Sequence, residues 1–284
     1  MPELFTTPKN CIEFCVWGRY ALFTDPLTRI GGEKSSYHLP TYEALKGICK
    51  SIYWKPTIIW YVDKVRIVRR IRTQTRGMKP LNFDGIFASA RDPDKKQTPP
   101  NTLSIYTYLT GDARSENPAD IADGPGVVYQ VRAHFEWNPY HAALAGDRID
   151  GKHYAIAKRS LERGGRQDIF LGTRDCQGYV GPCAFGEGQG DYDSDGSLDY
   201  GLTFHSFDYP DETGVDRLGA NFWRPRLVNG VLKFPRPDDA TQIVKKDIRA
   251  MRPRVFGVDC VRSVEEETVE LAAATGKLDQ ETPS

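Results

Sequence analysis

The sequence of 284 residues contains no long apolar segment. Its longest uninterrupted apolar run covers residues 58–62, whereas a helix that crosses a bilayer needs about 20 such residues. The first ten residues, MPELFTTPKN, do not combine a basic stretch with an apolar one, so we expect no secretory signal. These absences predict a cytoplasmic protein.

Cysteine is also scarce, with six in the chain. That number is too low for a disulfide scaffold in a protein of this length. The pairs Cys11/Cys15 and Cys176/Cys183 lack the CxxC spacing of a structural zinc site. We therefore expect buried free thiols and no metal site.

The chain has no net charge, because 38 basic residues balance 38 acidic ones. This balance argues against a nonspecific nucleic-acid binder, but the charges are unevenly distributed. Residues 64–79 carry seven basic side chains and no acidic one, and residues 261–284 carry six acidic side chains against two basic ones. The second stretch is typical of a solvated tail. The first is a candidate surface for a polyanion, although a run of charge is often only a solvated face.

The first part of the chain predicts a strand, a helix and a second strand. Residues 12–17 alternate apolar and polar side chains, which indicates a half-buried strand. Thr41 is a suitable N-cap for a helix whose apolar residues recur at i, i+3, i+4 and i+7, and Pro56 ends that helix after residues 53–55. Residues 57–62 are apolar and rich in β-branched side chains, so they predict a buried strand.

The middle of the chain repeats this order. Residues 102–109 favour a strand that can pair with the basic stretch as a protruding hairpin. Residues 127–137 alternate most clearly of all, residues 151–163 have a helical apolar face, and residues 169–171 form a short strand. The predicted order is that of a ferredoxin-like (RRM-like) βαββαβ unit: strand, helix, strand, inserted hairpin, strand, helix and strand.

Beyond residue 178 the pattern is β-like and helices disappear. The candidate strands are residues 178–185, 201–209, 220–228 and 231–234, with Asn229-Gly230 as a hairpin turn. We predict an α+β fold with a ferredoxin-like domain over 1–173, interrupted by an inserted basic β-hairpin thumb and loops at 64–126. An antiparallel β-sheet domain follows over 174–260, and then the acidic tail at 261–284.

The predicted topology brings together Tyr53, at the end of the first helix, and Lys152 and His153, at the start of the second. A helix N-terminus offers unpaired backbone amides and the positive end of the helix dipole, so a phosphate is favoured there. Lys152 adds a full charge. The simpler alternatives are a solvated first turn for the Lys-His pair and an anchoring aromatic for the tyrosine.

An RNA phosphodiester at such a site carries its own nucleophile, the 2′-hydroxyl. Cleavage then requires only a base, an acid and charge stabilisation, without a metal or another cofactor. We hypothesise that His153 transfers protons, that Lys152 stabilises the phosphorane, and that Tyr53 orients or deprotonates the 2′-hydroxyl. The products would be a 2′,3′-cyclic phosphate and a 5′-hydroxyl.

An acidic motif at residues 191–195 is a weaker candidate for a functional site. Asp191, Asp193 and Asp195 mimic the start of a calcium-binding loop, but Leu202 occupies the position at which a bidentate glutamate is required. We interpret this segment as an exposed acidic turn. The histidines outside the trio show no metal-ligand spacing.

Three long blocks, residues 23–57, 147–180 and 207–214, resemble the Cas-five-d family of CRISPR-associated proteins from type I-C systems, in the RAMP superfamily. The resemblance implies a metal-independent endoribonuclease that cleaves precursor CRISPR RNA in its repeats. It further implies that the protein stays on the 5′ handle of the guide RNA as a subunit of the surveillance complex in antiviral defence. Its partners would be the RNA, the backbone and large subunits and possible target DNA. A noncatalytic subunit that binds the handle is the alternative.

The family's catalytic tyrosine, lysine and histidine fall on Tyr53, Lys152 and His153, so resemblance and topology select the same trio. The loops at 88–101, 110–126 and 186–199 look longer than the family pattern, and the acidic tail looks like an addition. We expect further RNA contacts from basic residues on the thumb, behind the second helix and in the first glycine loop. These candidates are Lys34, Arg66, Arg69, Arg70, Arg72, Arg76, Arg159, Arg163 and Arg166.

Overall fold

A computed structural model of the chain describes residues 9–26, 28, 33–78, 104–112, 126–149, 151–254 and 256. Much of the predicted thumb and the whole acidic tail at 261–284 lie outside the described residues. Within the described ranges, no helix combines the length and apolar character needed to span a bilayer.

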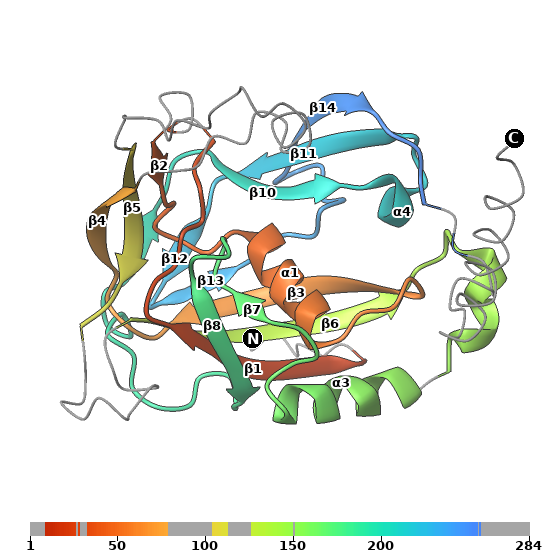
Figure 1. The fold of residues 1–284 in the computed structure, drawn as a ribbon, viewed down its shortest axis with the longest axis horizontal. Coiled ribbons are helices and arrows are strands. Elements are labelled where there is room, and N and C mark those ends of the chain that lie inside the picture. The colour runs from red at the N-terminus through yellow and green to blue at the C-terminus, as the bar shows by residue number, and fades with distance from the viewer. Residues whose placement is uncertain are drawn as a thin grey trace, which may run out of the picture.

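An eight-stranded sheet forms the centre of the molecule, in the order β7-β8-β1-β6-β3-β13-β12-β9 (Figure 1). Neighbouring strands with a recorded register pair antiparallel throughout this sheet. The strands in that order are β7 (Ile169–Phe170), β8 (Gln177–Pro182), β1 (Cys11–Gly18), β6 (Val127–Trp137), β3 (Ile58–Ile67), β13 (Val231–Lys233), β12 (Arg226–Val228) and β9 (Ser197–Asp199).

Two three-stranded sheets and the helices complete the described fold. The first small sheet has the order β10 (Thr203–Asp208), β11 (Arg217–Trp223) and β14 (Val244–Ala250), and the second has the order β2 (Lys34–Ser35), β5 (Ser104–Thr110) and β4 (Arg72–Met78). The helices are α1 (Tyr42–Ile52), the 3-10 helix η2 (Ala142–Asp147), α3 (Lys152–Glu162) and α4 (Pro210–Thr213). The fold is therefore a mixed α and β structure dominated by antiparallel sheets.

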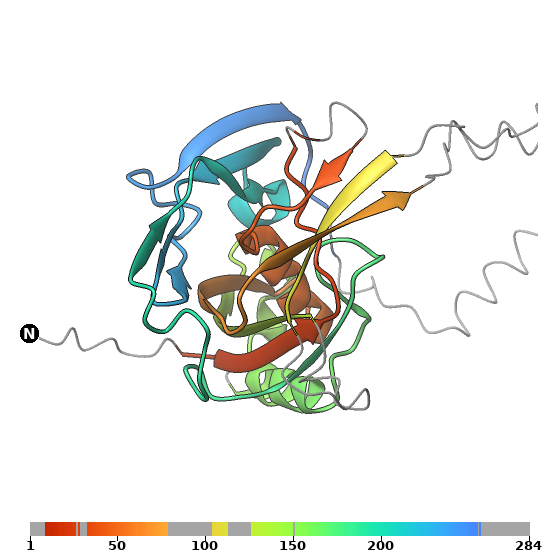
Figure 2. The ribbon, with the colours of Figure 1, turned by 90° about the vertical axis from the view of Figure 1, so that its left-hand side faces the viewer.

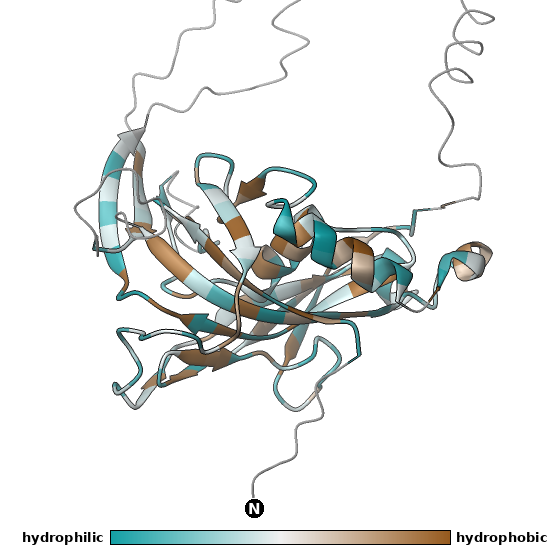
Figure 3. Ribbon diagram, turned by 90° about the horizontal axis from the view of Figure 1, so that it is seen from below, coloured by the Kyte–Doolittle hydropathy of each residue, from teal (hydrophilic) through white to brown (hydrophobic). Residues whose placement is uncertain are grey.

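The strands of the large sheet follow the alternation in the sequence. In β1 every second residue is buried, among them Ile12, Phe14 and Val16. Hydrophilic and hydrophobic residues both occur along the strands, as the bands of colour in Figure 3 show. Burial of the apolar set fixes the register, because a slip of one residue would turn that set toward solvent.

Helix α1 begins where the sequence predicts and ends at Ile52, just before the predicted end near residues 53–55. The Thr41 hydroxyl accepts a hydrogen bond from the Ala44 amide at 3.3 Å, as an N-cap does. The buried face includes Leu45, Ile48 and Ile52, and it packs against β3. The chain leaves the helix at Tyr53 in an extended conformation.

Helix α3 begins after Gly151, which has a φ of 77°. This left-handed conformation costs a residue with a Cβ atom more than it costs glycine. The turn makes Lys152 and His153 the first two helical residues, so their backbone amides belong to the unpaired N-terminal set.

The predicted hairpin exists, but it begins later than expected. Strand β4 pairs antiparallel with β5 along seven residues, and the pair extends to one side of the molecule (Figure 2). Residues 64–67 instead continue β3 in the middle of the large sheet. The prediction that the insertion starts at residue 64 was wrong on this point, because the buried strand runs five residues beyond Val62.

The second half of the chain also differs in detail. The strand next to β1 is β8, whereas the sequence assigned the closing strand to residues 169–171. Strand β13 pairs with β3, so the large sheet continues into the region beyond residue 174. Residues 220–228 form parts of two strands in different sheets, joined through Pro225. The short helix α4 and strand β14 were not predicted. The turn at Asn229-Gly230 is confirmed, with φ values of 46° and 74°.

Candidate functional site

Tyr53 is positioned by the end of helix α1. Its amide donates to the Cys49 carbonyl at 3.0 Å, and its own carbonyl accepts from the Trp60 indole at 2.7 Å. Trp60 is fully buried in β3, so this contact ties the turn after α1 to the central sheet. The Tyr53 side chain is thereby held at the junction of α1 and α3.

His153 connects Tyr53 to the segment before α3. The Tyr53 hydroxyl oxygen lies 2.7 Å from His153 Nδ1, and His153 Nε2 lies 2.6 Å from the Asp147 carbonyl oxygen. A carbonyl only accepts, so Nε2 carries the proton of the neutral ring and Nδ1 accepts from the phenol. The predicted meeting of the two helix ends is confirmed.

The Asp147 carboxylate is the point at which the nearby cations converge. Its Oδ1 lies 2.7 Å from Lys152 Nζ, and its Oδ2 lies 3.7 Å from Lys55 Nζ and 3.4 Å from the Thr57 hydroxyl. The same Oδ2 lies 3.4 Å from His153 Nε2. Burial acts to raise the pKa of Asp147, but the Lys152 hydrogen bond and the charge of Lys55 lower it overall. The group is therefore an anion at neutral pH.

The site is closed to solvent at its centre and open at its rim. Tyr53 is 1% exposed and His153 is 0% exposed, and the Trp137 ring packs edge-on against the imidazole at 5.4 Å. Burial and the Asp147 charge raise the pKa of the Tyr53 phenol, opposed by Arg166. The lysine side chains that face Asp147 remain more than 40% exposed. A substrate can thus reach the lysines before it reaches the phenol.

Some of the predicted RNA-contacting residues lie around the β4–β5 hairpin. The Lys34 ammonium lies over the Tyr106 ring at 4.8 Å, and the Arg76 guanidinium lies over the Tyr20 ring at 4.2 Å. Arg72 is exposed and pairs with Asp112 at 3.0 Å. This neighbourhood combines cations with aromatic rings.

Arg66, Arg69 and Arg70 occupy different surroundings from those predicted. Arg66 is 5% exposed and pairs with Asp193 at 2.7 Å, with Gln130 and two carbonyls as further acceptors. Arg69 is 4% exposed. The prediction that Arg66 lies on an exposed hairpin was wrong, because the loop that carries Asp193 covers this face of β3.

Arg70 is exposed and pairs with Asp195 at 2.7 Å, while its amide donates to Asp191. The acidic turn at residues 191–195 is therefore engaged by the basic stretch of the same chain. Among the described residues, no group of three or more His, Cys, Asp and Glu side chains has a geometry suited to a metal ion.

The predicted arginines of the α3 region are exposed. Arg159 lies in the last turn of α3 and Arg163 is its C-cap. The Arg166 guanidinium lies 5.3 Å from the centre of the Tyr53 ring, and its amide donates to the Ser51 carbonyl at 3.0 Å. Arg166 therefore belongs to the surroundings of the trio.

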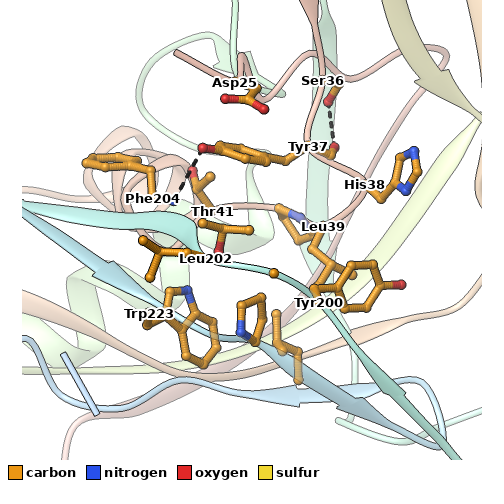
Figure 4. Close-up of a pocket in the computed structure, with 15 residues that line it drawn as sticks. Asp25, Ser36, Tyr37, His38, Leu39, Thr41, Tyr200, Leu202, Phe204 and Trp223 are labelled. Atoms are coloured by element: carbon orange, nitrogen blue, oxygen red, sulfur yellow. Dashed lines mark hydrogen bonds between the residues drawn. The ribbon is translucent and has the colours of Figure 1, made fainter. Parts of the chain in front are cut away.

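A separate cavity of about 320 Å³ lies between the segment 36–41 and strands β10 and β11 (Figure 4). The Tyr37 hydroxyl accepts from the Phe204 amide at 3.4 Å, which links its two sides. The lining is mainly aromatic and aliphatic and includes none of Tyr53, Lys152 and His153. This cavity has no part in the chemistry considered below.

Sequence reasoning missed Lys55, Thr57, Trp137 and Asp147 as parts of the site. Lys55 follows Tyr53 by two positions, and Asp147 precedes Lys152 by five, so both lie close to the trio in the sequence. Neither belongs to a periodic helix or strand pattern. The available signal was their closeness in sequence to the trio, as charged residues next to the predicted helix ends.

Comparison with known proteins gives this chain a family. The sequence model of the Cas5d family, CRISPR-associated protein Cas5, matches residues 11–235. A relative from Mannheimia succiniciproducens, named CRISPR pre-crRNA endoribonuclease Cas5d, is 27% identical over 80% of this chain and 95% of its own length. A relative of the same name from Thermus thermophilus is 26% identical over 59% of this chain and 62% of its own length.

Solved structures agree with this match. One titled as a CRISPR-associated protein superposes with a TM-score of 0.62 and 30% identity, covering 83% of this chain and 97% of that one. A functionally uncharacterized protein from Streptococcus mutans gives a TM-score of 0.61 with the same identity and coverage. The chain belongs to the Cas5d family of CRISPR-associated proteins.

Proposed function

We propose that this protein is an endoribonuclease that cleaves precursor CRISPR RNA within its repeats, with Tyr53, His153 and Lys152 as its catalytic residues. The names of the two relatives support the activity and the substrate. The observation that carries the assignment of residues is the hydrogen bond of 2.7 Å between the Tyr53 phenol and the His153 imidazole. It couples the phenol, which we assign to the ribose 2′-hydroxyl, to an imidazole, the side chain that most often serves as a general base.

The hydrogen-bond directions define the proton path. The raised pKa of Tyr53 keeps the phenol protonated at neutral pH, so it needs His153 to act as a base. The 2′-hydroxyl gives its proton to the phenol oxygen while the phenol proton moves to His153 Nδ1. The 2′-oxygen then bonds to phosphorus as the bond from phosphorus to the 5′-oxygen breaks, and His153 gives up a proton to the leaving 5′-oxygen, which departs as a 5′-hydroxyl.

Lys152 stabilises the charge that builds on the phosphorane. Its ammonium lies at the N-terminus of α3, where the helix dipole acts in the same direction. The products of this route are a 2′,3′-cyclic phosphate and a 5′-hydroxyl. No step of it requires a metal ion, so cleavage in EDTA is expected.

The strand order supports a ferredoxin-like unit as part of this proposal. Strands β8, β1, β6 and β3 lie side by side and antiparallel, with α1 between β1 and β3 and α3 between β6 and β8 in the chain. This is the βαββαβ order with β8 as its fourth strand. A division into domains near residue 174 and a cytoplasmic location remain part of the same proposal.

The cations around the hairpin and after α3 supply an RNA-binding surface in this account. Phosphate contacts and stacking on aromatic or guanidinium planes are how proteins hold single-stranded RNA. The proposed partners are the guide RNA that stays bound after cleavage, the other subunits of a surveillance complex, and its target DNA. The proposed contacts are those from Lys34, Arg70, Arg72, Arg76, Arg159, Arg163 and Arg166.

One observation favours a noncatalytic alternative. His153 is fully buried at the centre of the site. A subunit that only binds the guide handle does not need this imidazole to contact RNA. The two functions differ in whether the purified protein cuts its repeat RNA.

The test incubates the protein with its cognate repeat RNA in EDTA and compares wild type with His153→Ala, Lys152→Ala and His38→Ala. His38 is exposed and lines the separate cavity, so its substitution controls for the loss of an imidazole. We expect specific cutting by wild type and His38→Ala and intact RNA with the other two variants. Binding without cutting by all four proteins would instead establish the scaffold function.

A further inference from the structure

The Asp147 carboxylate sits at a point where donors from two parts of the chain converge. Lys55 and Thr57 come from the connection between α1 and β3, and Lys152 and His153 come from the start of α3. The four donor atoms lie between 2.7 and 3.7 Å from the carboxylate oxygens. We call these four side chains the oxyanion site.

The oxyanion site carries more positive charge than its occupant neutralises. Two ammonium groups face a single carboxylate, and both lysines stay accessible to solvent. Ammonium, hydroxyl and imidazole groups donate hydrogen bonds to a phosphate oxygen as well as to a carboxylate oxygen, because both groups present anionic oxygen acceptors. A phosphodiester therefore fits the chemistry of this site.

The segment that carries Asp147 is held by polar contacts rather than by apolar burial. We call residues 142–149 the cover segment; its 3-10 helix is the short coil at the right of Figure 1 and contains no buried residue. No side chain caps that helix. Arg148 holds the segment through the carbonyls of Asn138 and His141, at 2.8 and 3.1 Å. Little apolar area is lost when the segment moves, so its opening costs chiefly the polar contacts of Asp147 and Arg148, and an RNA phosphate can replace those that the Asp147 carboxylate makes.

We propose that Lys55, Thr57 and Lys152 bind the scissile phosphodiester and that the Asp147 carboxylate occupies this site until RNA displaces it. The inference rests on the proposed endoribonuclease function and adds Lys55 as a further phosphate-contacting residue. It also explains the closure of the centre. When the cover segment leaves, His153 Nε2–H loses its carbonyl partner and faces the vacated position, 3.4 Å from where Asp147 Oδ2 lay.

The test measures the dissociation constant for repeat RNA that is uncleavable because the scissile nucleotide is 2′-deoxy. Wild type is compared with Asp147→Asn, Asp147→Ala, Lys55→Met, Lys55→Arg and the double variant Asp147→Asn/Lys55→Met. Glu162→Gln, at the far end of α3, removes a carboxylate elsewhere, and Lys246→Met, on exposed β14, removes an ammonium elsewhere. Thermal unfolding of each variant establishes that it is folded.

We expect Asp147→Asn and Asp147→Ala to bind the RNA about tenfold more tightly than wild type, and Lys55→Met to bind it about tenfold less tightly. Lys55→Met should also reduce the slope of log Kd against log salt by about one, as the loss of one phosphate contact does. Lys55→Arg should retain most of the affinity. The gain from Asp147→Asn should shrink in the double variant, because both residues act on one site.

The proposal is overturned if both Asp147 variants bind the RNA as wild type does or more weakly, or if Glu162→Gln gives the same gain. Additive effects in the double variant, or an unchanged salt slope in Lys55→Met, would equally contradict a shared phosphate site. These binding results are separate from cleavage. Wild type that fails to cut its repeat removes the proposed function, whereas wild type that cuts while Asp147→Asn gains no affinity removes only this inference.

Discussion

Two clusters in this protein place a pair of lysines around one carboxylate, and they differ in their access to water. In the first, Lys46 and Lys50 of α1 bind Glu212 of α4. In the second, Lys55 and Lys152 face Asp147. Glu212 and Lys46 are 13% and 3% exposed, whereas the lysines of the second cluster are more than 40% exposed.

Because they differ in burial, the Glu212 cluster and the Asp147 cluster have different roles, although both pair lysines with a carboxylate. Burial acts to raise the pKa of Glu212, but the charges of Lys46 and Lys50 lower it overall, so the pair is ionised inside the protein. Removing Glu212 takes away the carboxylate that the buried Lys46 pairs with, whereas removing one lysine leaves Glu212 the other. The Asp147 cluster can exchange its carboxylate for another anion from solvent. The first cluster joins α1 to the second half of the chain, and the second can bind a ligand.

The largest effect is expected on stability at the buried cluster. Glu212→Ala should lower the free energy of unfolding by about 3–5 kcal/mol, because Lys46 stays buried without its partner. Urea unfolding measures this, with Asp216→Ala, an exposed carboxylate in the same region, as control. A loss no greater than that of the control would show that the cluster does not hold α4 against α1.

The next effect is on catalysis at the open cluster. Lys152→Met should slow single-turnover cleavage by about 10²-fold or more, through lost stabilisation of the phosphorane. Lys50→Met, the matched lysine of the buried cluster, should leave the rate of the folded protein unchanged. Equal rates for the two variants would remove the distinction between the clusters.

The pH dependence of stability sharpens the comparison further. The folded-state pKa of Glu212 lies below its ordinary value of 4.5, so its contribution is complete above pH 4.5 and is lost as the pH falls through the folded value. Wild type should therefore lose stability on acidification below pH 4.5 more steeply than Glu212→Gln. Urea midpoints between about pH 5 and pH 3 measure both slopes. Parallel curves would contradict a depressed pKa for Glu212.

The smallest effect is on stability at the open cluster. Asp147→Asn should change the free energy of unfolding by about 1 kcal/mol or less, since exposed ion pairs contribute little. Urea unfolding at neutral pH measures it beside Glu212→Ala. A loss of the same size as that of Glu212→Ala would mean that the Asp147 cluster is structural, and the cover segment would then not be displaceable.

The sequence predicted the helix ends that build the site because local rules decide them. Thr41 as N-cap and the apolar faces of α1 and α3 are each visible in a few consecutive residues. With the topology they place Tyr53 beside His153. The resemblance selected the same residues independently.

The remainder depends on contacts that no periodicity records. Alternation placed Arg66 on the polar face of a strand, but it could not show that the loop bearing Asp193 covers that face. Likewise, Asp147, in the 3-10 helix that follows β6, lies 3.7 Å from Lys55, 92 residues earlier in the chain. Strand β13 pairs with β3 over a long sequence separation, because Val231 lies opposite Arg66, 165 residues earlier in the chain, and no local pattern reaches that far.

The central claim is that the junction of α1 and α3 cleaves RNA through its own 2′-hydroxyl. The most direct measurement first maps the bond that wild type cuts in its cognate repeat, and then replaces the 2′-hydroxyl at that nucleotide alone with hydrogen. We expect cutting at that bond to stop while the RNA is still bound, and the unmodified RNA to give a fragment ending in a 2′,3′-cyclic phosphate. Continued cutting of the modified bond would contradict the account.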